Sequence, residues 1–175
     1  MFFAKIRQNK LEWSQVMRSN DVLLGMPYNF IQFTGLQEIL AGWLDLDLGT
    51  YNHYSDSLHL YSRDMSKVGV SEGTVLENND SLALCKEETE KLFKEIYRRM
   101  DFLSTHDVTE NEIYSLGQLN SEYVPYNNMM LIIAAYVAKK QHLDELVAEL
   151  IKKCSNTVYV TMWNRWVNRK NMNKG

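Results

Sequence analysis

The sequence predicts an α/β protein of the α+β kind, with a small sheet, a long core helix and a helical C-terminal part. Residues 2–17 carry β-favouring side chains on both sides of the polar turn at 8–10, which is typical of a hairpin. Residues 29–44 repeat apolar side chains every three or four positions, which indicates a buried helix. The same spacing recurs after residue 81, so the second half of the chain is expected to be helical.

The hairpin and the helix each carry a further signal. In the second strand of the hairpin, Leu11 and Trp13 share one face, and Arg18 comes at the strand's end. Gly35 and Gly42 lie inside the predicted helix, where glycine predicts close packing against a neighbouring segment.

A second extended run covers residues 51–61, after a break at 49–50. Its odd positions project to one face and hold Tyr51, His53, Ser55, Ser57, His59 and Tyr61. A face with this composition is unusual for a core and typical of a site lined by hydrogen-bonding groups.

The predicted organisation is a core at 1–64, a loop or linker at 65–81 rich in Gly, Ser, Asn and Asp, and a helical part at 82–175 of the same or an appended domain. In the helical part, Thr109 and Glu112 match a capping box, and Pro125 suits the first turn of a helix that runs to about residue 140. Apolar stripes over 92–103, 143–151 and 159–167 predict the other helices.

Composition excludes several classes of protein. The net charge of −3 gives no electrostatic case for nucleic acid. Cys85 and Cys154 are too few for a disulfide framework, and they show no zinc-ligand spacing, so no metal is expected. The longest apolar run, residues 129–138, is ten residues, about half of the roughly 20 that cross a bilayer. Without a signal-peptide pattern, a cytoplasmic protein that does not contact membranes is expected.

One ungapped motif points to a ligand: Arg-Ser-x-Asp-x-x-x-Gly-x-Pro-aromatic-Asn. Its members are Arg18, Ser19, Asp21, Gly25, Pro27, Tyr28 and Asn29. A guanidinium presents a fork of donors that matches phosphate oxygens, and a neighbouring hydroxyl adds a neutral donor. A side-chain amide both donates and accepts, so it can read a pyrimidine edge. The alternatives are a surface Arg-Ser pair and an Asn that caps the helix.

Through this motif the chain resembles the thymidylate synthase family. The resemblance is strongest over residues 2–64, and it implies a mixed sheet. It implies that Arg18 and Ser19 hold the phosphate of deoxyuridylate (dUMP) and that Asp21 belongs to a network touching the pyrimidine and the folate. By the same resemblance Asn29 pairs with the uracil edge. Related hydroxymethylases of cytosine nucleotides tend to have Asp at that position, so Asn29 favours uracil.

The triplet 59–61 resembles the family's His-x-Tyr, which implies that His59 and Tyr61 hold the 3′-hydroxyl of the deoxyribose. His53 also stands where the family has a His. The chain departs from the family at Ser57, where the family has Asp.

The resemblance does not extend to a catalytic cysteine. In the family a Cys thiolate adds to the pyrimidine, but the 17 residues before Arg18 contain no Cys, and Cys85 and Cys154 are expected to be structural. The chain is therefore interpreted in two ways. One is a truncated synthase, whose reaction would convert dUMP to dTMP with 5,10-methylenetetrahydrofolate. The other is a member that binds a pyrimidine nucleotide without methylating it.

The alternative class is a non-catalytic protein-interaction module derived from the synthase fold. Phe2, Phe3 and Ile6 support it, because an uncovered hairpin edge favours pairing with another chain. The expected cover is a second copy, giving a homodimer, or a companion chain over the N-terminal hairpin.

Overall fold

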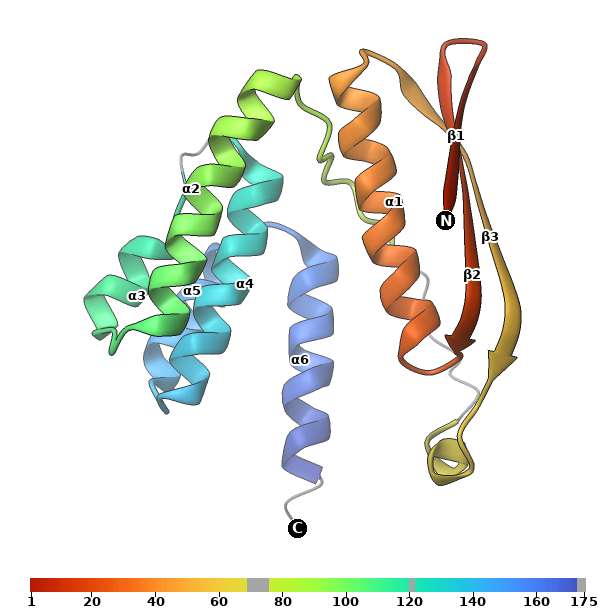
Figure 1. Cartoon of the computed structure of the whole chain (residues 1–175). Helices are drawn as coiled ribbons and strands as arrows, with labels where there is room; N and C mark the ends of the chain where they lie inside the picture. The colour runs from red at the N-terminus through yellow and green to blue at the C-terminus, as the bar shows by residue number, and fades with distance from the viewer. Residues whose placement is uncertain (69–75, 120–121, 173–175) are drawn as a thin grey trace. The chain divides into compact units, whose positions relative to one another are not determined.

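The computed structural model describes residues 1–68, 76–119 and 122–172, which divide between two compact units. Unit 1 comprises residues 1–68 and 82–89, and unit 2 comprises residues 76–81 and 90–172. Unit 1 holds a sheet and a helix, and unit 2 is helical (Figure 1). The predicted α+β class is confirmed.

The sheet of unit 1 has three strands in the order β1-β2-β3 and is mixed, as the family resemblance implied. β1 (Phe2–Arg7) runs antiparallel to β2 (Lys10–Asp21), and β2 runs parallel to β3 (Asp47–His59). Gln8 and Asn9 form the hairpin turn with φ values of 49° and 61°, the left-handed conformation that suits a two-residue turn between twisted strands.

Helix α1 (Gly25–Trp43) connects β2 to β3 and lies against one face of the sheet (Figure 1). Parallel neighbours need a crossover of this kind, because a tight turn cannot reverse the chain twice. The helix begins at Gly25, four residues before the predicted start at 29. The carboxylate of Asp21 explains the earlier start, because its Oδ1 accepts from the backbone N–H groups of Leu23 and Leu24, at 2.9 and 2.7 Å, and shapes the turn into the helix.

A buried amide fastens α1 to an irregularity in the sheet. The pairing of β2 with β3 shifts register between Leu11 and Trp13. There Nε2 of Gln37, a side chain only 3% exposed, donates to the carbonyl oxygens of Leu11 at 2.7 Å and Gly49 at 3.2 Å. Gly49 lies inside β3, so the break predicted at 49–50 is wrong. A Cβ at Gly49 would lie 2.8 Å from the Leu11 carbonyl oxygen, which explains why glycine occupies this strand position.

The segment at 82–84 packs against α1 within unit 1, as the two helical glycines predicted. A Cβ at Gly42 would lie 2.7 Å from both the backbone N and O of Leu84. A Cβ at Gly35 would lie 3.6 Å from Cδ1 of Leu82, which is ordinary contact. Only Gly42 is therefore required by close approach of two backbones.

Unit 2 is built from helices whose bounds follow the predicted stripes. They are α2 (Lys86–Thr105, whose first turn belongs to unit 1), α3 (Glu110–Leu116), α4 (Val124–Lys140), α5 (Asp144–Lys153) and α6 (Thr157–Met172). The capping box at Thr109 and Glu112 is confirmed, and Pro125 occupies the first turn of α4. Among the described residues, no helix combines the length and apolar character that spanning a bilayer requires.

The predicted linker at 65–81 is structured at both of its described ends. A short 3-10 helix, η1 (Ser62–Lys67), occupies its start, so the prediction of a loop from residue 65 is wrong there. Residues 69–75 of the linker lie outside the described residues. At its end, Nδ2 of Asn156 donates to Oδ1 of Asn78 and Oδ2 of Asp80, both at 2.7 Å, which fastens 76–81 to unit 2.

We predict opposite effects for alanine at the two glycines of α1. Gly42→Ala should lower the free energy of unfolding by roughly 1–3 kcal/mol, because the new methyl group meets backbone that cannot move aside. Gly35→Ala should raise it by up to about 1 kcal/mol through helix propensity alone. Urea unfolding of both variants measures the difference, and equal effects would contradict the close packing of 82–84 on α1.

Candidate functional site

The candidate site lies where the carboxyl ends of β2 and β3 meet the first turns of α1. The parallel register pairs Asp21 with His59, so both strands end at the same edge of the sheet. In open α/β sheets this edge, outside the carboxyl ends of the strands, is where ligands bind. All of the predicted site residues lie on β2, α1 and β3 or just beyond them.

Asn29 faces the end of β2. Its Nδ2 donates to Oδ1 of Asn20 at 3.0 Å. The N-cap of α1 is Leu24, and no side chain caps it, so the alternative interpretation of Asn29 as a helix cap is wrong. Among the described residues Asn29 Oδ1 has no hydrogen-bond partner, which leaves one acceptor and one N–H of the amide free.

Asn20 is the centre of the site and was missed by the sequence analysis. Its side chain is 3% exposed, and its Nδ2 donates to Nε2 of His53 at 3.0 Å and to Oγ of Ser55 at 3.3 Å. Alternation along β2 predicts that position 20 lies on the same face as Glu12 and Ser14, opposite to the face of Leu11 and Trp13. The available signal was a short amide side chain, which strands disfavour, directly beside the Arg-Ser pair.

His53 is held on its other nitrogen by a tyrosine. Its Nδ1 lies 2.9 Å from Oη of Tyr51, and the Phe30 ring of α1 lies 4.9 Å from the imidazole, centroid to centroid. Burial raises the pKa of the Tyr51 phenol, so this hydroxyl stays protonated at neutral pH.

Ser19, His59 and Tyr61 form a second group at the same edge. Oγ of Ser19 lies 3.3 Å from Nδ1 of His59, and the rings of His59 and Tyr61 meet edge to face with centroids 4.9 Å apart. β3 ends at His59, so Tyr61 lies beyond the strand rather than on it as predicted. The ring contact nevertheless holds the predicted pair together.

Arg18 and Asp21 are placed differently from the other predicted residues. The Arg18 side chain is exposed, and within the described part of the chain it forms no ion pair. Its guanidinium is therefore free for an anion. Asp21 already uses Oδ1 to accept from two backbone N–H groups, which leaves mainly Oδ2 for a ligand.

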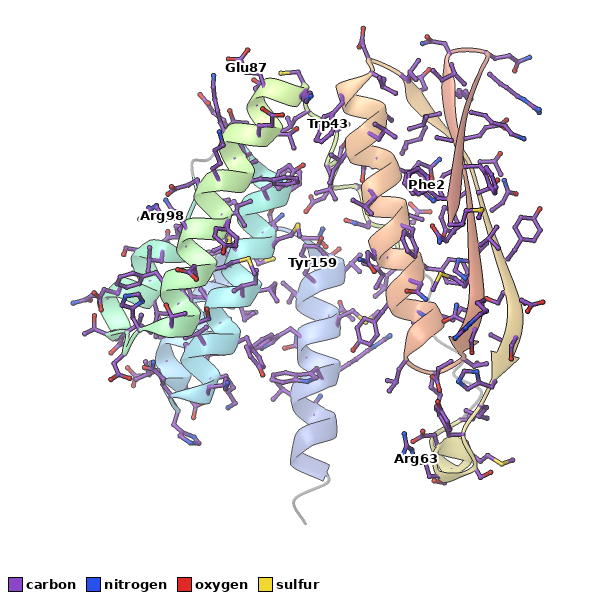
Figure 2. All side chains as sticks on the ribbon, in the orientation of Figure 1. Phe2, Trp43, Arg63, Glu87, Arg98 and Tyr159 are labelled. Atoms are coloured by element: carbon purple, nitrogen blue, oxygen red, sulfur yellow. The ribbon has the colours of Figure 1, made fainter. Side chains whose placement is uncertain are left out.

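A further cation beside the site was not predicted. Arg63 belongs to η1, just beyond the end of β3 (Figure 2). Its guanidinium carbon lies 4.9 Å from the centroid of the Tyr61 ring, and its Nε lies 3.5 Å from Oδ2 of Asp64. The signal in the sequence was its position two residues after Tyr61.

Within the described part of unit 1, Cys85 forms no hydrogen bond with the residues named above. Cys85 is exposed, and its thiol donates to Oε2 of Glu88 at 3.2 Å. Cys154 is buried in unit 2, and burial raises the pKa of its thiol, which disfavours the nucleophilic thiolate. Within the described ranges, no three His, Cys, Asp or Glu side chains gather as metal ligands.

Comparison with known proteins gives a consistent family. The family model described as thymidylate synthase matches residues 1–102. The chain is 30% identical to a deoxyuridylate hydroxymethyltransferase of Bacillus phage SP01, over 88% of this chain and 46% of the relative. It is 32% identical to the thymidylate synthase of Bacillus licheniformis, over 37% of this chain and 23% of that enzyme.

The chain spans about half the length of the phage relative and about a quarter of the bacterial synthase. Among solved structures, the thermostable thymidylate synthase A from Bacillus subtilis matches 44% of this chain and 29% of its own, with 26% identity and a TM-score of 0.41.

Proposed function

Because the chain belongs to the thymidylate synthase family, we propose that unit 1 binds dUMP at the carboxyl edge of β2 and β3. The observation that carries the proposal is the orientation of the Asn29 amide. Its Nδ2 donates to Oδ1 of Asn20 at 3.0 Å, which leaves Oδ1 and the second N–H of Asn29 free for a ligand. The amide offers an acceptor and a donor together, which is the pattern that the N3–H and O4 of uracil require. The name of the phage relative, a deoxyuridylate hydroxymethyltransferase, supports the same ligand.

Each part of the nucleotide has a candidate partner in this arrangement. The free guanidinium of Arg18 and the hydroxyl of Ser19 would bind the phosphate. His59 and Tyr61 would share the 3′-hydroxyl of the sugar, since their rings are in contact. The hydrogen bond between Ser19 and His59 makes the phosphate and sugar groups neighbours, as they are in one nucleotide.

The reaction that we propose for the whole protein is transfer of a one-carbon group to dUMP. The match to the hydroxymethyltransferase covers 88% of the chain, whereas the match to the bacterial synthase covers 37%. This difference favours transfer of a hydroxymethyl group over transfer of a methyl group. We assign no catalytic residue, because burial raises the pKa of the Cys154 thiol and, within the described part of unit 1, Cys85 forms no hydrogen bond with the site residues.

In the family reaction 5,10-methylenetetrahydrofolate would supply the one-carbon unit. The resemblance assigns only Asp21 to the network that touches the folate. One of its two carboxylate oxygens already accepts hydrogen bonds from two backbone N–H groups. The described residues therefore support nucleotide recognition better than folate binding.

We also propose that a second copy of the chain covers the hairpin and gives a homodimer. β1 pairs only with β2 among the described strands, so its other edge carries unpaired backbone groups. Phe3 and Ile6 are 51% and 60% exposed on this strand. Phe2 stacks on the buried Trp13 of β2, with ring centroids 4.3 Å apart.

The first test is calorimetric binding of dUMP to the full chain. We expect a dissociation constant above about 1 μM, because Arg18 offers the phosphate a single unpaired guanidinium, whereas Arg63 already lies 3.5 Å from Asp64. Arg18→Ala should weaken binding about tenfold or more, since a charge-assisted bond contributes roughly 1.5–3 kcal/mol. Arg7→Ala is the matched control, because it removes the same charge at the other end of the hairpin. Equal losses in both variants would contradict the phosphate assignment.

The second test concerns the base. Wild-type protein should prefer dUMP over dCMP by about tenfold to a hundredfold, because a mismatched buried polar pair costs roughly 1–3 kcal/mol. Asn29→Asp should narrow or invert that preference, since a carboxylate only accepts. Competition binding of the two monophosphates measures the ratio, and an unchanged ratio in the variant would mean that Asn29 does not read the base.

The third test is the oligomeric state, measured by size exclusion with light scattering. Wild-type protein should have about twice the 20.5 kDa mass of one chain. Phe3→Lys should shift it toward monomer by placing a charge on the exposed strand. Tyr97→Lys, at a side chain 73% exposed on α2, should leave the mass unchanged. A monomeric wild-type protein would rule out the homodimer.

A further inference from the structure

The hydrogen bonds around Asn20 form one continuous chain from β3 to α1. Tyr51 Oη meets His53 Nδ1 at 2.9 Å, His53 Nε2 meets Asn20 Nδ2 at 3.0 Å, and Asn20 Oδ1 meets Asn29 Nδ2 at 3.0 Å. The two inner members, His53 and Asn20, each use one polar atom toward the residue before and another toward the residue after. The donor or acceptor role at one end of the chain therefore fixes the roles along its whole length.

In the observed arrangement the roles run in one direction. Because Asn20 Nδ2 only donates, His53 Nε2 must accept, which places the imidazole proton on Nδ1 and directs it to the Tyr51 oxygen. Asn20 Oδ1 is then left for Asn29, so Asn29 must turn its Nδ2 toward Asn20. The free edge of Asn29 presents its Oδ1 and its second N–H, in the order that uracil requires.

Protonation of His53 reverses every role after it. A protonated imidazole donates from both nitrogens, so Nε2 then requires Oδ1 of Asn20. Asn20 has to rotate its amide, and its Nδ2 now faces Asn29, which must present Oδ1 in return. The free edge of Asn29 is thereby exchanged, with a donor where the acceptor was, which is the order that the N3 and amino group of cytosine require.

The residues around this series of hydrogen bonds are compatible with both arrangements. The hydroxyl of Ser55, 3.3 Å from Asn20 Nδ2, can donate or accept and so fits both arrangements. The groups that meet the imidazole are Tyr51 of its own strand, Asn20 of β2 and Phe30 of α1. Within the described residues no charged group contacts the ring, and Tyr51, whose pKa burial raises, stays neutral. The proton on His53 is thus what selects the arrangement.

We propose that His53 and Asn20 are positioning residues that set the base preference of the site, with neutral His53 selecting uracil and protonated His53 selecting cytosine. The proposal rests on the binding of a pyrimidine nucleotide proposed above. It assigns the choice of base to residues that need not touch the base themselves. Lower pH should therefore shift the preference from uracil toward cytosine.

The ligand-free protein gives a test that does not depend on nucleotide binding. Nitrogen-15 NMR of the full chain should show the Nδ1–H tautomer of His53 near pH 8. On titration to about pH 5.5, the side-chain amide signals of Asn20 and Asn29 should move with the same midpoint as the His53 ring. In His53→Phe these movements should disappear. In Asn20→Leu the His53 ring should still titrate while the Asn29 amide no longer follows.

The binding test compares dUMP with dCMP at the two pH values. The two ligands share one phosphate, so its own titration cancels in the ratio of their affinities. The ratio should favour dUMP by about tenfold or more near pH 8 and fall by about tenfold near pH 5.5. His53→Phe and Asn20→Leu should each make the ratio independent of pH. His106→Gln removes a histidine of unit 2 and should keep the pH dependence of the parent.

The outcomes separate the two proposals. Amide signals of Asn29 that ignore the His53 titration would overturn the coupling, whether or not a nucleotide binds. A base ratio that stays constant with pH while both nucleotides bind would also overturn it. Failure of both nucleotides to bind, with the NMR coupling intact, would refute the proposed nucleotide binding and leave the coupling supported by its own measurement.

Discussion

The parallel pairing of β2 with β3 is the constraint on which the site depends. It brings Asp21 beside His59, although the whole of α1 separates them in the sequence. Since parallel strands end at the same edge, the polar side chains at the end of β2 meet those of β3 there. The turn shaped by Asp21 then starts α1 within a few residues, so the helix delivers Asn29 to the same edge.

Side-chain amides at two places along α1, the buried Gln37 and the half-buried Asn29, orient the helix on the sheet. Gln37 bonds the carbonyl oxygens of Leu11 and Gly49 where the register of the strands shifts, and Asn29 bonds Asn20 near the other end of the helix. Apolar contacts would hold the helix on the sheet, but they would tolerate small rotations and shifts. Buried hydrogen bonds tolerate them far less, because a misplaced partner leaves a polar group unpaired. Recognition therefore rests on the same kind of interaction that fixes the register.

The matches to known proteins cover different lengths of the chain. The family model covers 1–102, and the bacterial synthase matches only 37% of the chain, whereas the phage hydroxymethyltransferase matches 88%. The phage relative thus shares sequence beyond the segment common to the family. Unit 2 carries its own buried network, in which Asn156 holds Asn78 and Asp80. This network anchors residues 76–81 before the chain returns to pack along α1.

The sequence by itself determined the elements whose signals are local: the hairpin turn within 8–10, the capping box at Thr109, and the helix whose first turn holds Pro125. It also identified the family, because the motif of residues 18–29 is contiguous. Only the tertiary structure decided the place of Asn20, since strand alternation predicts the other face for it. The start of β3 at Asp47 likewise depends on pairing with β2, and the choice among hydrogen-bond directions around His53 depends on residues from three elements. Local patterns fix which segments form, whereas contacts between distant segments fix which polar atoms meet.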